Sequence, residues 1–146
     1  LHYFYNLWSM DNNHRGDINA PNNIDVVKTI YDPCPVGFNV PTNGAFSGFT
    51  TSTTNGTNVP ATFELNSGHI FWVNSSHTES IYFPASGFRN AKDAILKDAL
   101  TSGNYWSADP QDYNNGCAMG FNETEIRPLF RNIRTYGFAV RPVAEK

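Results

Sequence analysis

Proline and glycine interrupt this chain so often that it has little room for long regular elements. Nine Pro and eleven Gly are spread over 146 residues and separate short apolar runs. These runs are rich in Val, Ile, Phe, Tyr, Trp and Thr, a composition typical of strands between turns. They comprise residues 25–31, 46–50, 62–65, 69–73, 80–83, 104–107, 117–121 and 135–143. The pattern predicts a β-rich domain and excludes a doubly wound α/β fold.

One segment departs from this pattern and predicts a helix. Residues 91–100 place Ile95 and two alanines on one helical stripe, with two leucines beside it. Asn90 is a suitable N-cap, and Gly103 follows the end of the segment. For residues 3–10, which contain four aromatic side chains, helix and strand remain alternatives. We therefore expect one or two short helices beside the strands.

The charge pattern excludes some classes of partner. Charged residues form 16% of the chain, against about 25% in an average domain, and the formal net charge is -3. Ten Lys and Arg without a basic stripe argue against nucleic acid as a partner. No apolar run approaches the ~20 residues of a membrane span, so we expect no membrane insertion by this segment. Four arginines near the C-terminus have Glu123 and Glu125 beside them, and we interpret them as solvated surface charge: Arg127, Arg131, Arg134 and Arg141.

Residue patterns that carry catalysis are missing from the sequence. There is no Gly-x-Ser-x-Gly nucleophile turn and no phosphate-binding glycine loop. The four histidines are scattered, and for His69, beside Ile70 and Phe71, we expect a hydrogen-bonded structural role. Cys34 and Cys117 match no zinc or redox spacing. They either form one disulfide or are two small buried hydrophobes. We therefore predict a protein that is not an enzyme and has no metal site and no cofactor.

A polar, aromatic stretch at residues 104–115 has the composition of a sugar-binding site. Neutral sugars need planar amides and carboxylates beside an aromatic platform, with few fixed charges. The candidate ligand-binding residues are Asp109, Asp112, Tyr113, Asn114 and Asn115. The alternative is a polar loop over a core Tyr105–Trp106 pair; a Ca²⁺ site is a weaker reading, because the spacing fits no EF-hand. A second polar stretch, residues 47–58, predicts an exposed loop or hairpin tip.

Five ordered blocks resemble the Fibrobacter succinogenes major paralogous domain family, as found at the C-terminal ends of Bacteroidetes fimbrillin-like and other surface proteins. They are Y-N-L-W, D-P-C-P-V-G-F-N-V-P, Y-F-P-A-S-G-F-R, G-N-Y-W-S-A and G-F-A-V-R-P-V. In this sequence they occupy residues 5–8, 32–41, 82–89, 103–108 and 137–143. The chain departs from many relatives at Pro142, where those relatives have a Cys that could pair with the position of Cys34.

This resemblance implies a fold and a role. The fold would be α+β and C-type-lectin-like, with small antiparallel sheets, one or two short helices and long irregular loops. The whole chain, 1–146, would be a single such domain and the C-terminal part of a longer surface protein. The resemblance also implies a bacterial, extracellular, cell-surface location. We expect a non-catalytic recognition or adhesion module that binds a glycan or a surface protein through its loops. The alternative is a structural or protein-interaction domain at the end of a pilus tip or a surface lipoprotein.

Overall fold

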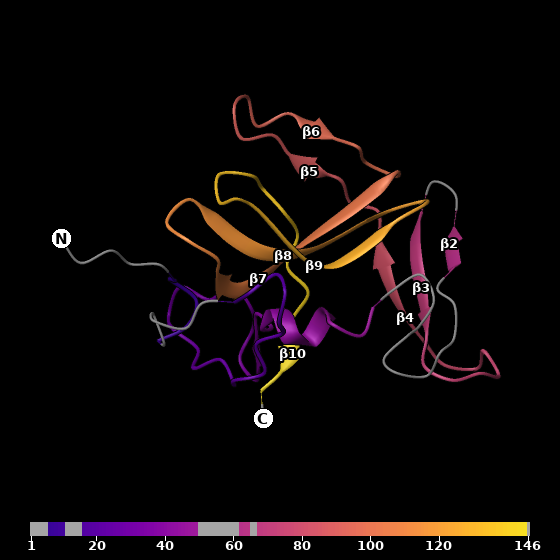
Figure 1. Cartoon of the computed structure of the whole chain (residues 1–146), viewed down its shortest axis with the longest axis horizontal. Coiled ribbons are helices and arrows are strands. Elements are labelled where there is room, and N and C mark those ends of the chain that lie inside the picture. Colours follow the sequence, from indigo (N-terminus) through magenta and orange to yellow (C-terminus); the bar gives the residue numbers. More distant parts are fainter. Residues whose placement is uncertain (1–5, 11–15, 50–61, 65–66, 146) are drawn as a thin grey trace.

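The computed structural model describes residues 6–10, 16–49, 62–64 and 67–145. Within these ranges the chain folds into strands, with one 3-10 turn, η1 (Asn43–Phe46), and no α-helix (Figure 1). The expected polar loop at 47–58 lies for the most part outside the described residues.

Two three-stranded antiparallel sheets form the body of the fold. The longer strands make the central sheet, in the order β7–β8–β9, and shorter strands make a second sheet, in the order β2–β3–β4. The central strands are β7 (Ser102–Pro110), β8 (Asn115–Asn122) and β9 (Ile126–Ile133). The second sheet consists of β2 (Thr62–Glu64), β3 (Gly68–Trp72) and β4 (Ser80–Pro84).

Two short strand pairs complete the structure. β1 (Phe38–Asn39) pairs with β10 (Val143–Ala144) and joins the chain's early part to its C-terminal end. β5 (Phe88–Arg89) pairs with β6 (Leu96–Lys97) in a hairpin that projects beyond the central sheet at the top of Figure 1.

The main core lies between one face of the central sheet, the second sheet and η1. Its centre is aromatic, because Phe71 and Phe83 from the second sheet meet edge to face at 5.5 Å. Phe83 also meets Tyr105 of β7 at 5.0 Å. The buried members of this core are Phe46, Phe49, Phe71, Phe83, Ala85, Tyr105, Met119, Phe121 and Ile126. The paired aromatic rings therefore fix how the second sheet packs on the central one.

The expected α+β, C-type-lectin-like fold is wrong, because the described residues are nearly all β and contain no α-helix. The predicted helix at 91–100 is instead the outer part of the β5–β6 hairpin and the turn that follows it. Left-handed backbone at Ala94, Asp98 and Leu100, with φ of 56°, 53° and 70°, breaks any helical repeat there. The apolar residues of this segment have no surface to pack on, because Ile95 remains 53% exposed. A helix of this length needs such packing to be stable.

Several predicted strands are confirmed, and others are wrong. The runs at 62–65, 69–73, 80–83, 104–107 and 117–121 correspond to β2, β3, β4, β7 and β8. Residues 25–31 and the described part of 46–50 form no strand, and 135–143 pairs only through isolated bridges and the start of β10. β9 was not predicted, because arginines and a proline interrupt its apolar pattern.

Candidate functional site

The face of the central sheet away from the core is built on a strand of small residues. Gly116, Ala118 and Gly120 of β8 alternate with the buried Cys117, Met119 and Phe121, and alternate residues point to opposite faces. Their cross-strand partners share their face. These partners are Asn104, Trp106, Pro110, Arg127, Phe130 and Asn132. Large aromatic rings can therefore lie flat on the backbone of β8.

Trp106 and Phe138 form the centre of this outer face. Their rings stack with centroids 4.4 Å apart and planes at 27°. The stack is positioned by the backbone, since Trp106 N–H donates to the carbonyl of Ala139 at 2.9 Å and Ala139 N–H donates to that of Asn104 at 3.0 Å. Gly116 makes room for it, because a Cβ there would lie 3.1 Å from the indole of Trp106. The stacked pair has a hollow on either side.

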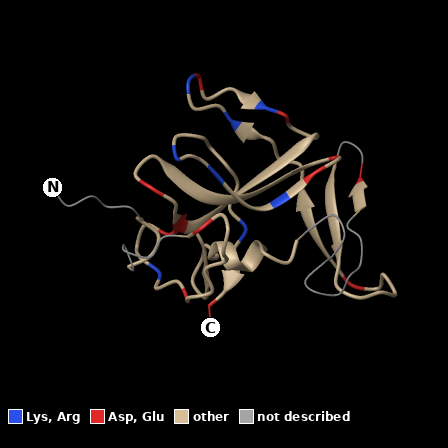
Figure 2. Cartoon of the chain, viewed as in Figure 1, with Lys and Arg blue, Asp and Glu red and all other residues tan. Residues whose placement is uncertain are grey.

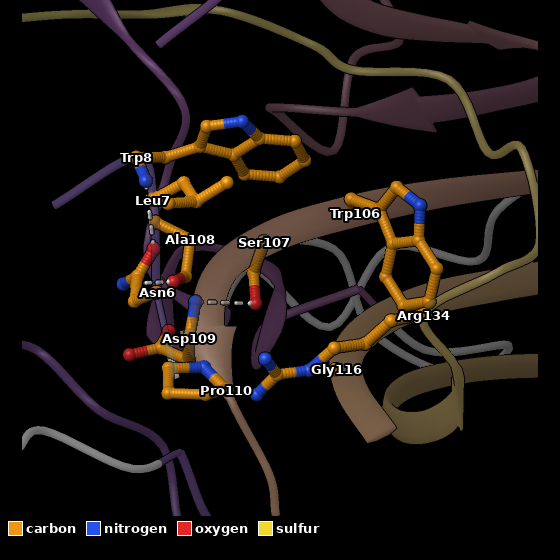
Figure 3. A pocket seen from close by; sticks show the side chains of 10 residues that line it. All are labelled: Asn6, Leu7, Trp8, Trp106, Ser107, Ala108, Asp109, Pro110, Gly116 and Arg134. Carbon is orange, nitrogen blue, oxygen red and sulfur yellow. Dashed lines mark hydrogen bonds between the residues drawn. The ribbon is translucent and has the colours of Figure 1, made fainter. Parts of the chain in front are cut away.

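The first hollow, which we call the tryptophan hollow, has a volume of about 290 Å³. Figure 3 shows the rings of Trp8 and Trp106 on its opposite sides. It is lined by Asn6, Leu7, Trp8, Trp106, Ser107, Ala108, Asp109, Pro110, Gly116 and Arg134. Two indoles beside an amide and a guanidinium provide apolar surface and directed polar groups in one place, which is the composition of a small-ligand site.

Asn6 positions the Trp8 side of the hollow. Its side-chain amide donates to the carbonyl of Ala108 on β7. Its Oδ1 accepts the backbone N–H groups of Trp8 at 2.9 Å and Ser9 at 3.3 Å. One side chain thus attaches the N-terminal segment to the central sheet and turns the chain at Trp8.

Arg134 forms the opposite rim. Its Nη2 donates to the carbonyl of Asp112 at 2.8 Å and its Nε to that of Asn115 at 3.1 Å.

Arg141, like Arg134, is held by contacts within the fold. It donates to the carbonyl of Tyr82 and lies 4.6 Å from the ring centroid of Phe83. The interpretation of the C-terminal arginines as solvated charge is therefore wrong for these two. Both are partly buried and bonded to backbone oxygens.

Asp109 is the only predicted site residue that lines the tryptophan hollow. Its carboxylate is buried, 5% exposed, and accepts hydrogen bonds from the side chain of Asn22 and the backbone N–H of Asn43. These bonds tie the N-terminal half to β7. We therefore assign Asp109 a structural role at the edge of the hollow.

Of the other four predicted residues, three lie in the turn between β7 and β8, and Asn115 is the first residue of β8. Asp112 Oδ1 accepts the N–H groups of Asn114 at 2.8 Å and Asn115 at 2.9 Å, and the Asn115 amide at 3.0 Å. These hydrogen bonds, the Asn115 side chain first, lower the pKa of Asp112. Tyr113 is 63% exposed at the tip. The turn is thus held by its own polar groups, and none of the four lines the hollow.

Both cysteines and His69 are buried. Cys34 and Cys117 are both buried free thiols, so the disulfide alternative is wrong. Burial raises the pKa of each thiol to about 12, with the nearby Asp32 and Asp109 adding to the effect. His69 packs between Phe63 and Phe121 with Nε2 3.1 Å from the carbonyl of Asn122, as its expected structural role requires, and burial lowers its pKa. Within the described part of the chain, no three His, Cys, Asp or Glu side chains come together to hold a metal.

Sequence reasoning missed most of the hollow. The sequence leaves helix and strand open for the segment of Trp8, offers a core role as the alternative for Trp106 in the 104–115 stretch, and predicts solvated surface charge for Arg134. Trp106 is indeed 8% exposed and also lines the cavity. One sequence feature could have revealed this face of the sheet. Small residues alternate at Gly116, Ala118 and Gly120, and a strand face without large side chains lets aromatic rings lie close to the backbone.

The fold and site together define an all-β domain with aromatic-lined hollows on one face of its central sheet. The chain belongs to the family described as Domain of unknown function (DUF8237), whose family model matches residues 64–143. The matched part contains Trp106, Arg134 and Phe138, whereas Asn6, Leu7 and Trp8 precede it. Neither a curated protein nor a solved structure matches the chain. No helix among the described residues is long and apolar enough to cross a membrane.

Proposed function

We propose that this domain is a non-catalytic recognition module that binds a glycan or glycoprotein in the tryptophan hollow. The observation that carries the proposal is the pairing of Trp8 and Trp106 across one cavity with Arg134 at its rim. The C–H face of a sugar ring packs on indole, and amide and guanidinium groups bind its hydroxyls. The site therefore replaces the loop at 109–115 as the proposed point of contact.

The unreactive state of the candidate nucleophiles supports a role in binding. Thiols with a pKa raised to about 12 are not thiolates at neutral pH. The Asp109 carboxylate is engaged by amide donors. The proposed location, the bacterial cell surface, rests on the sequence resemblance to surface-protein domains. Figure 2 shows that the charged residues are scattered over separate strands and loops, which favours a glycan or a protein over nucleic acid as partner.

A structural or protein-interaction role is the second candidate, and the β5–β6 hairpin favours it. This hairpin projects from the body of the fold. Its apolar side chains Ile95, Leu96 and Leu100 are 53%, 50% and 55% exposed. Exposed apolar side chains on a projecting element are typical of protein contacts.

The test of glycan binding uses the three tryptophans as internal reporters. Screening the domain on a glycan array, with and without Ca²⁺, identifies ligands whose affinity is then measured by tryptophan fluorescence. Trp8→Ala should weaken binding by about tenfold or more, because a stacking platform contributes on the order of 1 kcal/mol or more. Trp72→Ala is the matched control, since Trp72 is also half-buried but lies in the second sheet.

Two results would contradict the proposal. One is an array with no ligand above background in either condition. The other is equal weakening by Trp8→Ala and Trp72→Ala, which would show a general loss of structure. Absence of glycan binding, combined with loss of a protein partner after Leu96→Ser, would instead support the second candidate.

A further inference from the structure

A second hollow lies on the other side of the Trp106–Phe138 stack. This hollow, the amide groove, has a volume of about 290 Å³ and sits on the outer face of the central sheet beside the base of the β5–β6 hairpin. It is lined by Phe88, Asp98, Ser102, Asn104, Phe121, Asn122, Arg127, Phe130, Arg131, Asn132, Tyr136 and Phe138. All of these residues fall within the part of the chain that matches the family model.

Gly120 lies between two residues that line the groove, Phe130 and Asn104. A Cβ at this position would lie 2.8 Å from the ring of Phe130 and 3.3 Å from Oδ1 of Asn104. The bare backbone therefore lets an aromatic ring and an amide approach from either side. Phe138 lies 6.2 Å from Phe130 and 6.0 Å from Tyr136, so an aromatic wall borders the groove.

The amides of the groove leave hydrogen-bonding capacity free. Asn104 is 9% exposed, and its Oδ1 accepts no hydrogen bond from any described residue. This oxygen therefore has free capacity to accept a hydrogen bond from a ligand hydroxyl. Asn122 and Asn132 use their Oδ1 atoms to accept backbone N–H groups. Among the described contacts, their NH₂ groups donate no hydrogen bond.

Two arginines line the groove, and one of them makes no hydrogen bond or ion pair with a described residue. Arg127 lies 3.7 Å from the carboxylate of Glu125 and 5.0 Å from the ring centroid of Phe130. Arg131 makes no hydrogen bond and no ion pair within 4 Å in the described structure, and acts on Asp112 only as a longer-range charge that helps lower its pKa. Asp98 is the opposing charge, on the segment that leads from β6 into β7.

From this arrangement we infer a second binding site, in the amide groove, for a saccharide unit that carries a carboxylate. The ring of the sugar lies against Phe130, and one of its hydroxyls donates to Oδ1 of Asn104. The carboxylate lies on the β9 side, where Arg131 lines the groove from the edge strand of the sheet and supplies a forked donor. Asp98 faces the opposite edge and disfavours the reverse orientation.

The experiment compares two probes that differ only at C6, methyl β-D-glucuronide with a carboxylate and methyl β-D-glucoside with a hydroxymethyl group, by NMR titration of the ¹⁵N-labelled domain. We expect the glucuronide to bind about tenfold more tightly and to shift the amide signals of β9 and Asn104. Arg131→Gln should abolish this preference. Lys92→Gln removes an exposed positive charge on the hairpin, outside the groove, and should retain it.

Two further variants complete the design. Asp98→Asn removes the opposing charge at a left-handed position that Asn tolerates, and should tighten glucuronide binding. Trp8→Ala leaves the amide groove intact and should bind glucuronide as the wild type does. Preference retained in Arg131→Gln, equal binding of both probes, or loss of binding in Trp8→Ala would each overturn the inference. The last result alone would place the ligand in the tryptophan hollow, so failure of one site is distinguishable from failure of the other.

Discussion

Trp106 and Phe138 stack with ring centroids 4.4 Å apart, and each ring lines a different hollow of the same sheet face. The indole belongs to the tryptophan hollow and the phenyl ring to the amide groove. One stacked pair therefore separates the two proposed sites and supports a wall of each.

Replacing Trp106 with Ala should cost about 3–5 kcal/mol of unfolding free energy, as for other large-to-small changes at buried aromatics. The indole is 8% exposed, and its loss would leave Phe138 without its stacking partner. Urea denaturation measures the change. Trp72→Ala, at a half-buried position stacked on His77, should cost less. Equal costs for the two variants would refute the structural importance of the stack.

Gly103→Ala should be more damaging than Gly116→Ala. A Cβ at Gly103 would lie 2.2 Å from the ring of Phe121 in the core, whereas one at Gly116 would lie 3.1 Å from Trp106. Overpacking of this kind costs about 1–3 kcal/mol, and Phe121 is 3% exposed with little space to move. Thermal unfolding of both variants tests the order, and the reverse order would contradict the packing described for the two faces of the sheet.

Asp112→Ala should lower the melting temperature, because three N–H donors of the β7–β8 turn lose their acceptor. Glycan affinity in the tryptophan hollow should change little, since Asp112 does not line it. Asn114→Ala removes a side chain that makes no hydrogen bond to any described residue, and serves as the control. An unchanged melting temperature together with weakened glycan binding in Asp112→Ala would show instead that the loop at 109–115 contacts the ligand.

Both thiols should be inert in the folded domain at pH 8, because burial raises the pKa of Cys34 and Cys117 to about 12. A colorimetric disulfide reagent should react with two thiols only after denaturation with guanidinium chloride. Rapid reaction of the native protein, or no thiol after unfolding without reductant, would contradict the two buried free cysteines.

Acidification should destabilise the domain partly through His69. Burial lowers its pKa in the folded state below the ordinary value of 6.5, so the unfolded state binds a proton more readily. Its contribution is constant above the unfolded pKa and is lost progressively as the pH falls below 6.5. Unfolding free energies from pH 7.5 to 5 should therefore fall more steeply for the wild type than for His69→Gln. His77→Gln, at an exposed histidine, is the control; equal slopes for wild type and His69→Gln would refute the buried, neutral imidazole.

The local sequence determined the strand content and much of the core. Alternation and β-branched or aromatic composition identified β3, β4, β7 and β8, because such runs bury one face whatever their partners are. The same reasoning predicted a helix at 91–100, because the apolar residues of that segment have helical spacing. That helix fails because stability depends on an apolar surface for Ile95 and Leu96 to pack on, and the fold supplies none.

Tertiary structure decided the site. Asp109 and Asn114 are five residues apart in one polar stretch, yet one carboxylate is buried against Asn22 and the other side chain lies in an exposed turn. Trp8, Trp106 and Arg134 are far apart in sequence and meet because Asn6 bonds to Ala108 and Arg134 bonds across the β7–β8 turn. Composition determined that amides and aromatic rings would dominate this protein. Only the register of three strands placed those groups beside a bare glycine backbone, because contacts across a sheet depend on pairing that no single segment encodes.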